Sequence, residues 1–224
     1  MTALREARAI AAKDLRIQVR GRFAVATVLP FAATVLIAFG LSLGPGRTLL
    51  QQTAPGLLWM AVLFASILSF RQAYRSEGED DALEGLLLSP ASRAAIFLGK
   101  AAAVTVELLA LEVAVVLAVV VLFDVSLGAA PLAVAGAFVL GTVGLAAVGS
   151  LFGILAESPR PREAVFPLLV LPLATPILVA GARATASAAG GAGAEAGSWL
   201  GLLVAFDLVF VATGMLVYGY LLED

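Results

Sequence analysis

Six long apolar runs, separated by short polar segments, set the pattern of this chain. A helix needs about 20 residues to cross the hydrocarbon core of a bilayer. The runs near this length are Phe23–Leu43, Gly56–Phe70 (extended backward to Thr53), Ala95–Phe123, Pro131–Leu155, Ala164–Gly181 and Trp199–Leu221. None contains an Arg, and Lys100 lies near the start of the third, where its stem can reach the interface. The pattern predicts an all-α integral membrane protein with six transmembrane helices.

The composition supports lipid as the natural solvent of the chain. Of the 224 residues, 61% are hydrophobic and only 13% are charged, whereas a soluble domain carries about 25% charged residues. The absence of Cys and His excludes disulfides and thiol chemistry and removes the commonest general base and haem ligand. A net charge of −2 gives no sign of a nucleic-acid partner.

The distribution of Lys and Arg predicts the orientation of the six helices. One side of the membrane would carry Arg5, Arg8, Lys13, Arg16, Arg20, Arg22, Arg71, Arg75, Arg93, Lys100, Arg160 and Arg162. The other side would carry only Arg47 and Arg183. Because positive residues stay in the cytoplasm, we predict a multi-pass membrane protein with both termini cytoplasmic. The outer loops are then 44–52, 124–130 and 183–197, and the last, rich in Gly, Ala and Ser, is expected to be flexible.

Residues 3–20 have the pattern of an amphipathic helix. Leu4, Ala7, Ile10, Ala11, Leu15 and Ile17 gather on one side, and Arg5, Arg8, Lys13, Arg16 and Arg20 on the other. A basic amphipathic helix joined to a membrane span is expected to lie in the interface plane. Two interpretations stay open: an anchor that sets the topology, or an interfacial helix that also touches a partner.

The segment 71–94, between the second and third spans, predicts a short cytoplasmic helix over residues 77–88. Ser76 and Glu79 have the spacing of a capping box. Glu77, Glu79, Asp80 and Asp81 fall in the first turns, where the helix dipole favours acids, and Glu84 follows. Leu83, Leu86 and Leu87 then form an apolar face, and Ser89-Pro90 ends the helix. Such a face must dock on this chain's own helix ends or on another subunit.

Three acids lie inside the predicted spans: Glu107, Glu112 and Asp207. An ionised acid at mid-bilayer costs about 2.5–3.5 kcal/mol, and no Arg in the spans can pair with these. Glu107 and Glu112 are five residues apart, about 140° around a helix, and do not share a face. Hydrogen bonding between helices is one interpretation. A place in a translocation path or in contact with a partner membrane subunit is the other.

Glycines and prolines mark two further features of the spans. Gly149 and Gly153 form a GxxxG motif, typical of close helix contact. Pro167, Pro172 and Pro176 are expected to kink or break the fifth span.

The second span and the segment after it carry a recognisable series of motifs. These are Ala54-Pro55-Gly56-Leu57-Leu58-Trp59, Phe70-Arg71, Leu83-Glu84, Leu86-Leu87-Leu88-Ser89-Pro90 and the downstream Lys100. Together they resemble the haem exporter protein B (CcmB) family, most densely over residues 53–100. The pattern departs in the acidic turn, where Asp80-Asp81-Ala82 replaces Asp-Gly-Ser and Gly85 replaces Gln.

The resemblance implies a permease subunit of an ABC-type complex for cytochrome c maturation. Residues 1–224 would form one permease domain, an ABC-2-type exporter-like transmembrane domain with residues 1–22 as its interfacial helix. The segment 71–94 would hold the coupling helix, and its contacts with the ATPase would come from Glu79, Asp80, Leu83, Glu84, Leu86 and Leu87. The implied partners are a CcmA-like ATPase that binds ATP, a CcmC-like haem-handling membrane subunit and the lipid bilayer. The chain itself would bind no cofactor or metal and would not be an enzyme, while the complex would handle haem.

Two alternatives remain at this point. One is an ABC-2-like permease for another substrate, such as a drug or a lipid. The other is a proton-coupled secondary transporter that uses Glu107, Glu112 and Asp207.

Overall fold

The computed structural model describes residues 3–21, 23–78, 91–153 and 165–221, and everything regular in these ranges is helical. The elements are α1 (Ala3–Gly21), a π-helical stretch η1 (Ala24–Val28), α2 (Leu29–Leu43), α3 (Arg47–Gly78), α5 (Arg93–Phe123), α6 (Pro131–Phe152), α7 (Val165–Ala189) and α8 (Gly193–Leu221). This confirms the prediction of an all-α protein.

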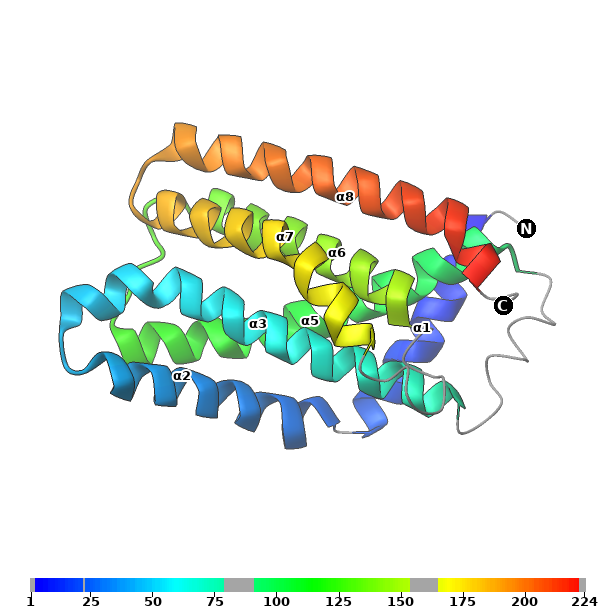
Figure 1. Ribbon diagram of the computed structural model, residues 1–224, viewed down its shortest axis with the longest axis horizontal. Coiled ribbons are helices and arrows are strands. Elements are labelled where there is room, and N and C mark those ends of the chain that lie inside the picture. The colour runs from blue at the N-terminus through cyan, green and yellow to red at the C-terminus, as the bar shows by residue number, and fades with distance from the viewer. Residues whose placement is uncertain (1–2, 22, 79–90, 154–164, 222–224) are drawn as a thin grey trace.

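Six helices are long and apolar enough to cross a membrane, as predicted from the sequence. They run side by side along the long axis of the molecule, and both ends of the chain lie at the same end of this bundle (Figure 1). Short connections at residues 44–46, 124–130 and 190–192 join the helices at the opposite end. An even number of membrane crossings places both termini on the same side, which is the arrangement that the distribution of Lys and Arg requires.

Two of the predicted outer loops are shorter than expected, because their residues are helical. The first covers 44–46 and not 44–52, since α3 begins at Arg47. The stretch 183–197, expected to be flexible, instead contains the last turns of α7 and the first turn of α8. Gly191 makes this tight connection possible: its φ of +79° is left-handed, and Ala192 N–H donates to the Ser187 carbonyl at 2.8 Å, which is a Schellman ending.

The prolines of α7 do not break it. Pro172 and Pro176 lie inside one continuous helix of 25 residues. Figure 1 shows the first turns of α7, in yellow, leaning relative to the rest of the helix. Of the two expected outcomes, the kink therefore fits and the break does not. Each proline lacks the N–H group that would form one backbone hydrogen bond of the helix. Packing against neighbouring helices stabilises the helix despite these missing bonds.

The helix predicted over 77–88 falls largely outside the described residues, which stop at Gly78 and resume at Ala91. What is described contradicts one detail. Ser76 lies within α3 and not at the start of a new helix, so it does not form the N-cap of the predicted capping box. The second span continues without interruption through Arg71 to Gly78 because its sequence contains no helix breaker after Pro55.

Helix α1 forms as predicted and lies across the first turns of α5, at the end of the bundle that holds both termini (Figure 1). The two helices approach closely at Gly99, where a Cβ atom would lie 2.8 Å from the Ala7 carbonyl oxygen. Ser92 caps α5 by accepting from Ala95 N–H at 3.2 Å, and its own N–H donates to Glu6 of α1 at 3.2 Å. Lys100, expected to extend toward the interface, is buried in the protein with 5% exposed.

The opposite end of α5 is tied to α3 by polar contacts. Asp124, the residue that ends α5 with a left-handed φ of 50°, pairs with Arg47. The Gln51 side chain donates to the Asp124 carbonyl at 2.7 Å. These contacts satisfy groups at a helix end that would otherwise lack partners.

Candidate functional site

The residues predicted to contact an ATPase, Glu79, Asp80, Leu83, Glu84, Leu86 and Leu87, lie outside the described residues. Their two fixed ends are described. Helix α3 leads into the segment at Gly78, and the capped start of α5 leaves it at Ser92. The site that the structure describes in atomic detail is the polar and aromatic interior of the bundle.

Glu112 of α5 forms a buried hydrogen bond with α6. The Thr142 hydroxyl donates to its Oε1, and the two residues are 4% and 0% exposed. The hydroxyl thus satisfies one oxygen of this buried carboxyl group, in an interior where an unpaired polar group is costly. The other oxygen, Oε2, has no hydrogen-bond partner among the described residues. This contact supports the structural interpretation of Glu112, as a link between α5 and α6.

Glu107 lies one and a half turns earlier on α5 and faces a different helix. Its side chain lies within reach of the Ser69 hydroxyl of α3. Ser69 is 1% exposed, so this second polar pair also sits in the interior. The prediction that Glu107 and Glu112 do not share a face is confirmed, because they contact α3 and α6 respectively.

Asp207 of α8 is 8% exposed and points at α6. A Cβ atom added to Gly144 would lie 2.7 Å from the Oδ1 atom of Asp207. Because Gly144 has no side chain, there is room for the carboxyl group. Among the described residues neither carboxyl oxygen has a hydrogen-bond partner. Asp207 is therefore a buried carboxyl group for which the described helices provide space but no hydrogen-bond donor.

The three acids do not form one site. Thr142 and Gly144 are two residues apart on α6, about 200° around the helix, so Glu112 and Asp207 meet opposite sides of α6. Glu107 meets α3. Among the described residues no three Asp or Glu side chains gather in a way that could hold a metal ion. This separation gives a proton-coupled transporter no shared carboxyl cluster to work with.

Trp59 is the centre of the interior and joins three helices. From α3 its indole reaches between α6 and α7, and a Cβ atom on either Gly141 or Gly181 would collide with the ring. Its Nε1–H donates to Thr185 of α7 at 3.0 Å, and its ring stacks on Phe138 at 5.7 Å between centroids. Trp59 is the aromatic residue of the APG-apolar-Trp motif, so the motif encodes this junction.

The same construction recurs along the bundle. Aromatic rings fill spaces that glycines on neighbouring helices leave open: Phe70 faces Gly149, Phe97 faces Gly214 and Phe123 faces Gly40. The GxxxG prediction is thereby refined, because at Gly149 a ring from α3, and not a helix backbone, makes the close contact. Sequence reasoning found Gly149 but missed these pairs, whose members lie far apart in the chain.

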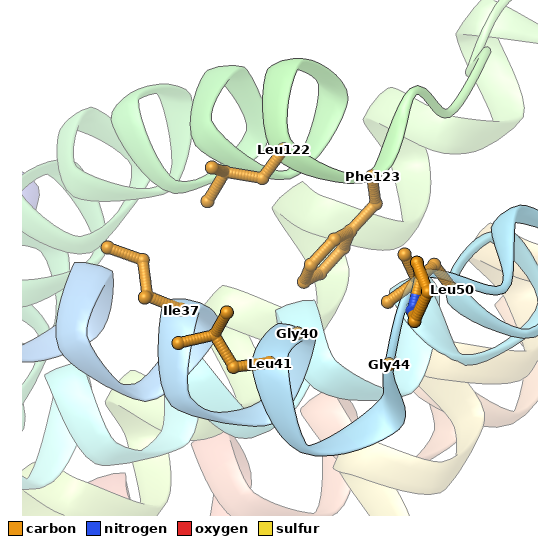
Figure 2. Close-up of a pocket in the computed structure, with 8 residues that line it drawn as sticks. Ile37, Gly40, Leu41, Gly44, Leu50, Leu122 and Phe123 are labelled. Carbon is orange, nitrogen blue, oxygen red and sulfur yellow. The ribbon is translucent and has the colours of Figure 1, made fainter.

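An apolar groove opens near the end of the bundle away from the termini. It has a volume of about 370 Å³ and lies between α2 and the end of α5, lined by Ile37, Gly40, Leu41, Gly44, Pro45, Leu50, Leu122 and Phe123. Figure 2 shows Leu122 and Phe123 facing Ile37 and Leu41 across it. No lining side chain is charged or polar, so the groove offers no ligand for haem iron and no partner for a propionate.

Comparisons with known proteins agree with the architecture. Residues 5–220 match the family described as CcmB protein. The heme exporter protein B of Pseudomonas aeruginosa is 34% identical over 176 residues, which is 77% of each chain. That of Bradyrhizobium diazoefficiens is 31% identical over 218 residues, covering 96% of this chain and 94% of the relative. That of Escherichia coli K12 is 37% identical over 87 residues, 39% of this chain and 40% of the relative.

Proposed function

Because the chain belongs to the CcmB family, we propose that it is the membrane permease subunit of an ABC-type complex that exports or delivers haem for c-type cytochrome maturation. The observation that carries the proposal is the family match over residues 5–220 of a six-span bundle. The relatives are named heme exporter protein B, and this name supplies haem as the substrate class of the proposal.

Energy would come from a separate, CcmA-like ATPase. A P-loop needs glycines free to cradle phosphate and a Lys followed by Ser or Thr. The only Gly-Lys pair is Gly99-Lys100, followed by Ala101. Gly99 is in the interior of α5 and packs on the backbone of α1, so it cannot form a phosphate loop. Hydrolysis of ATP is therefore assigned to the partner, and this chain is the non-catalytic subunit.

Haem itself would be held mainly by another subunit, of the CcmC type. The chain contains no His and no Cys, which are the commonest axial ligands together with Met and Tyr. Tyr218 is fully buried and packs against Phe97, with the ring centroids 5.5 Å apart and the ring planes tilted by 55°, so it serves packing. The bundle would then provide a path or a moving element next to the haem-holding subunit.

The proposed contact with the ATPase is the coupling helix predicted over residues 77–88. The described residues on either side of it lie at the end of the bundle that holds both termini. We place that end in the cytoplasm of a bacterium and the bundle in its inner membrane, following the excess of Lys and Arg there. Rigid helices enter and leave the segment, since α3 extends to Gly78 and Ser92 caps α5. A movement of the ATPase against this segment would therefore be passed directly to α3 and α5.

The experiment is co-purification of the chain with its ATPase after replacing Leu83 and Leu87 with Ser. Each buried Leu contributes about 1.5–3 kcal/mol, so their joint loss should weaken association by about two or more orders of magnitude. The permease alone should keep its melting temperature. A matched control replaces Leu49 and Leu132, which are 44% and 88% exposed at the other end of the bundle.

Two results would contradict this assignment. Normal ATPase binding by the Leu83→Ser/Leu87→Ser variant would remove the segment as the contact. A lower melting temperature of the permease alone, with unchanged ATPase binding, would show that the leucines pack on their own domain.

ATP turnover by the purified chain alone would contradict the assignment of hydrolysis to a partner.

A further inference from the structure

The outward face of α1 carries a concentration of positive charge that the acids of the same helix balance only in part. Arg5, Arg8, Lys13, Arg16 and Arg20 are all exposed. The two acids of the helix are already engaged: Glu6 accepts from Ser92 N–H of α5, and Asp14 pairs with Lys13 at 3.5 Å. With five basic and two acidic residues, α1 has a net charge of +3, on a chain whose total charge is −2.

The charged face is opposite the face that packs on the bundle. Ala7 and Ile10 are buried against α5. Arg16, nine residues after Ala7, lies about 180° around the helix, and Arg5 and Arg20 lie beside it. The close contact at Gly99 fixes this rotation, so the basic side chains are held facing away from the protein.

Large apolar side chains border the basic face. Leu4 is 78% exposed and Val19 is 76% exposed, and both lie on the same flank of α1. A shallow hollow of about 260 Å³ is bounded there by Leu15, Arg16, Val19 and Arg20. A surface that alternates guanidinium groups with exposed aliphatic groups is well solvated neither by water alone nor by hydrocarbon alone. It matches the boundary where lipid headgroups meet acyl chains.

The position of α1 in the fold puts it at that boundary. The helix crosses the end of the bundle, and the first membrane-spanning stretch begins three residues after it, at Ala24 (Figure 1). Arg side chains can extend from such a place to phosphate groups while their stems cover apolar surface. The neighbouring lipid layer therefore offers negative charge within reach of these side chains.

We propose that the outer face of α1, formed by Arg5, Arg16 and Arg20 with Leu4, Leu15 and Val19 beside them, binds anionic phospholipid headgroups in preference to zwitterionic ones. The guanidinium groups bind the headgroup phosphates with paired N–H donors. Leu4, Leu15 and Val19 enter the upper acyl region. Since α1 is tied to α5 through Ser92 and Gly99, the lipid layer holds the start of α5 in place.

The test uses the full-length protein in nanodiscs of phosphatidylcholine, with or without phosphatidylglycerol in equal amount. Native mass spectrometry after release counts the phosphatidylglycerol and phosphatidylcholine molecules that remain bound. Each basic residue near an anionic surface strengthens binding about fivefold. The wild type should therefore retain phosphatidylglycerol strongly over phosphatidylcholine, and less so at high salt. The triple variant Arg5→Gln/Arg16→Gln/Arg20→Gln should lower this preference about a hundredfold, because three such contributions are lost.

Two controls separate this site from general effects. The variant Arg5→Lys/Arg16→Lys/Arg20→Lys keeps the charge and should keep most of the preference. Arg183→Gln removes an exposed cation from α7, away from α1, and should leave the preference unchanged. If the triple Gln variant fails to fold, the single Arg16→Gln variant should lower the preference about fivefold.

The proposal is overturned if the triple Gln variant, folded with a normal melting temperature, keeps the wild-type lipid preference. It is equally overturned if the wild type shows no preference, or if Arg183→Gln abolishes the preference as completely as the triple variant does. Loss of a co-purifying protein subunit without any change in lipid selectivity would assign this face to that subunit.

Discussion

At the scale of single residues, the interior is built from aromatic rings placed against glycines of neighbouring helices. A soluble core excludes water, but helices in a bilayer gain little from apolar burial, so close packing and hydrogen bonds hold them together. Trp59 satisfies both requirements, with glycines on α6 and α7 and a hydrogen bond to Thr185. The fixed contact between α3, α6 and α7 follows from this one residue.

Gly141→Ala should therefore destabilise the protein, because its methyl group would overlap the Trp59 ring. Overpacking of this kind costs about 1–3 kcal/mol. Gly201→Ala is the control, since a Cβ atom there meets nothing within 4 Å, and it should leave stability equal or higher. Thermal unfolding in detergent measures both. Equal melting temperatures for the two variants would disprove the account of the Trp59 contacts.

Substitutions at Glu112 and Thr142 test whether the Glu112 carboxyl group has a structural role or a role in transport. Glu112→Gln keeps an oxygen that accepts from Thr142 and should preserve both the melting temperature and haem export. Thr142→Val should lower stability by about 1–3 kcal/mol, since it leaves a buried carboxyl group without this donor. Export assays in cells and thermal unfolding give the two readouts. Lost export by a stable Glu112→Gln variant would show instead that the carboxyl group acts in transport.

Sequence reasoning located the buried acids but not their partners. Charged residues in apolar runs stand out individually, which is why Glu107, Glu112 and Asp207 could be found. Their neighbours Ser69, Thr142 and Gly144 do not stand out, because a membrane helix is apolar all round and its hydropathy does not show which side meets protein. The ring and glycine pairs escaped for the same reason, and a pair such as Trp59 and Gly181 is 122 positions apart in the chain.

At the scale of elements, helix number was predictable and helix ends were only partly so. The start of α6 at Pro131 and the end of α5 at Phe123 agree with the sequence, since Pro favours a first turn and the polar stretch after Phe123 interrupts the apolar run. The stretch 183–197 was expected to be a loop because Gly, Ala and Ser also make flexible linkers. In a bilayer Ala and Ser continue a helix readily, and only Gly191 requires a turn.

The docking of α1 on α5 is an element-scale prediction that can be tested by cysteine labelling, since the chain has no native Cys. Ala7→Cys should be protected from a thiol reagent, because Ala7 is 7% exposed. Adding Gly99→Val should make it reactive, since the new side chain meets Ala7 and Ile10. Arg5→Cys, already exposed, should react equally in both backgrounds. A protected Ala7→Cys in the Gly99→Val background would contradict this packing.

At the scale of the whole molecule, the orientation in the membrane follows from the charges and from the shared end of the two termini. Cysteines placed singly at Gly46, Gly128 and Gly193 should react with an impermeant thiol reagent from outside the cell, since each lies in or beside a connection at the far end. Gly193 is preferred to Gly191, whose φ of +79° disfavours a side chain. Ser76→Cys should stay unreactive until the membrane is opened. The reverse pattern would invert the topology.

The family of the whole molecule could be predicted from sequence because the motifs of residues 53–100 are dense, and the family match over residues 5–220 confirms that prediction. The coupling of the bundle to an ATPase depends on residues 79–90, outside the described part of the chain, and stays a prediction. The proposed function requires that a cell lacking this subunit cannot supply haem for covalent attachment to c-type cytochromes.

The most direct measurement of this central claim is covalent haem staining of c-type cytochromes in cells from which this chain has been deleted. The account predicts that c-type cytochromes disappear while b-type haem proteins remain. It also predicts that the wild-type chain restores them, whereas the Leu83→Ser/Leu87→Ser variant does not, although it reaches the membrane in equal amount. Normal c-type cytochromes in the deletion strain would contradict the account.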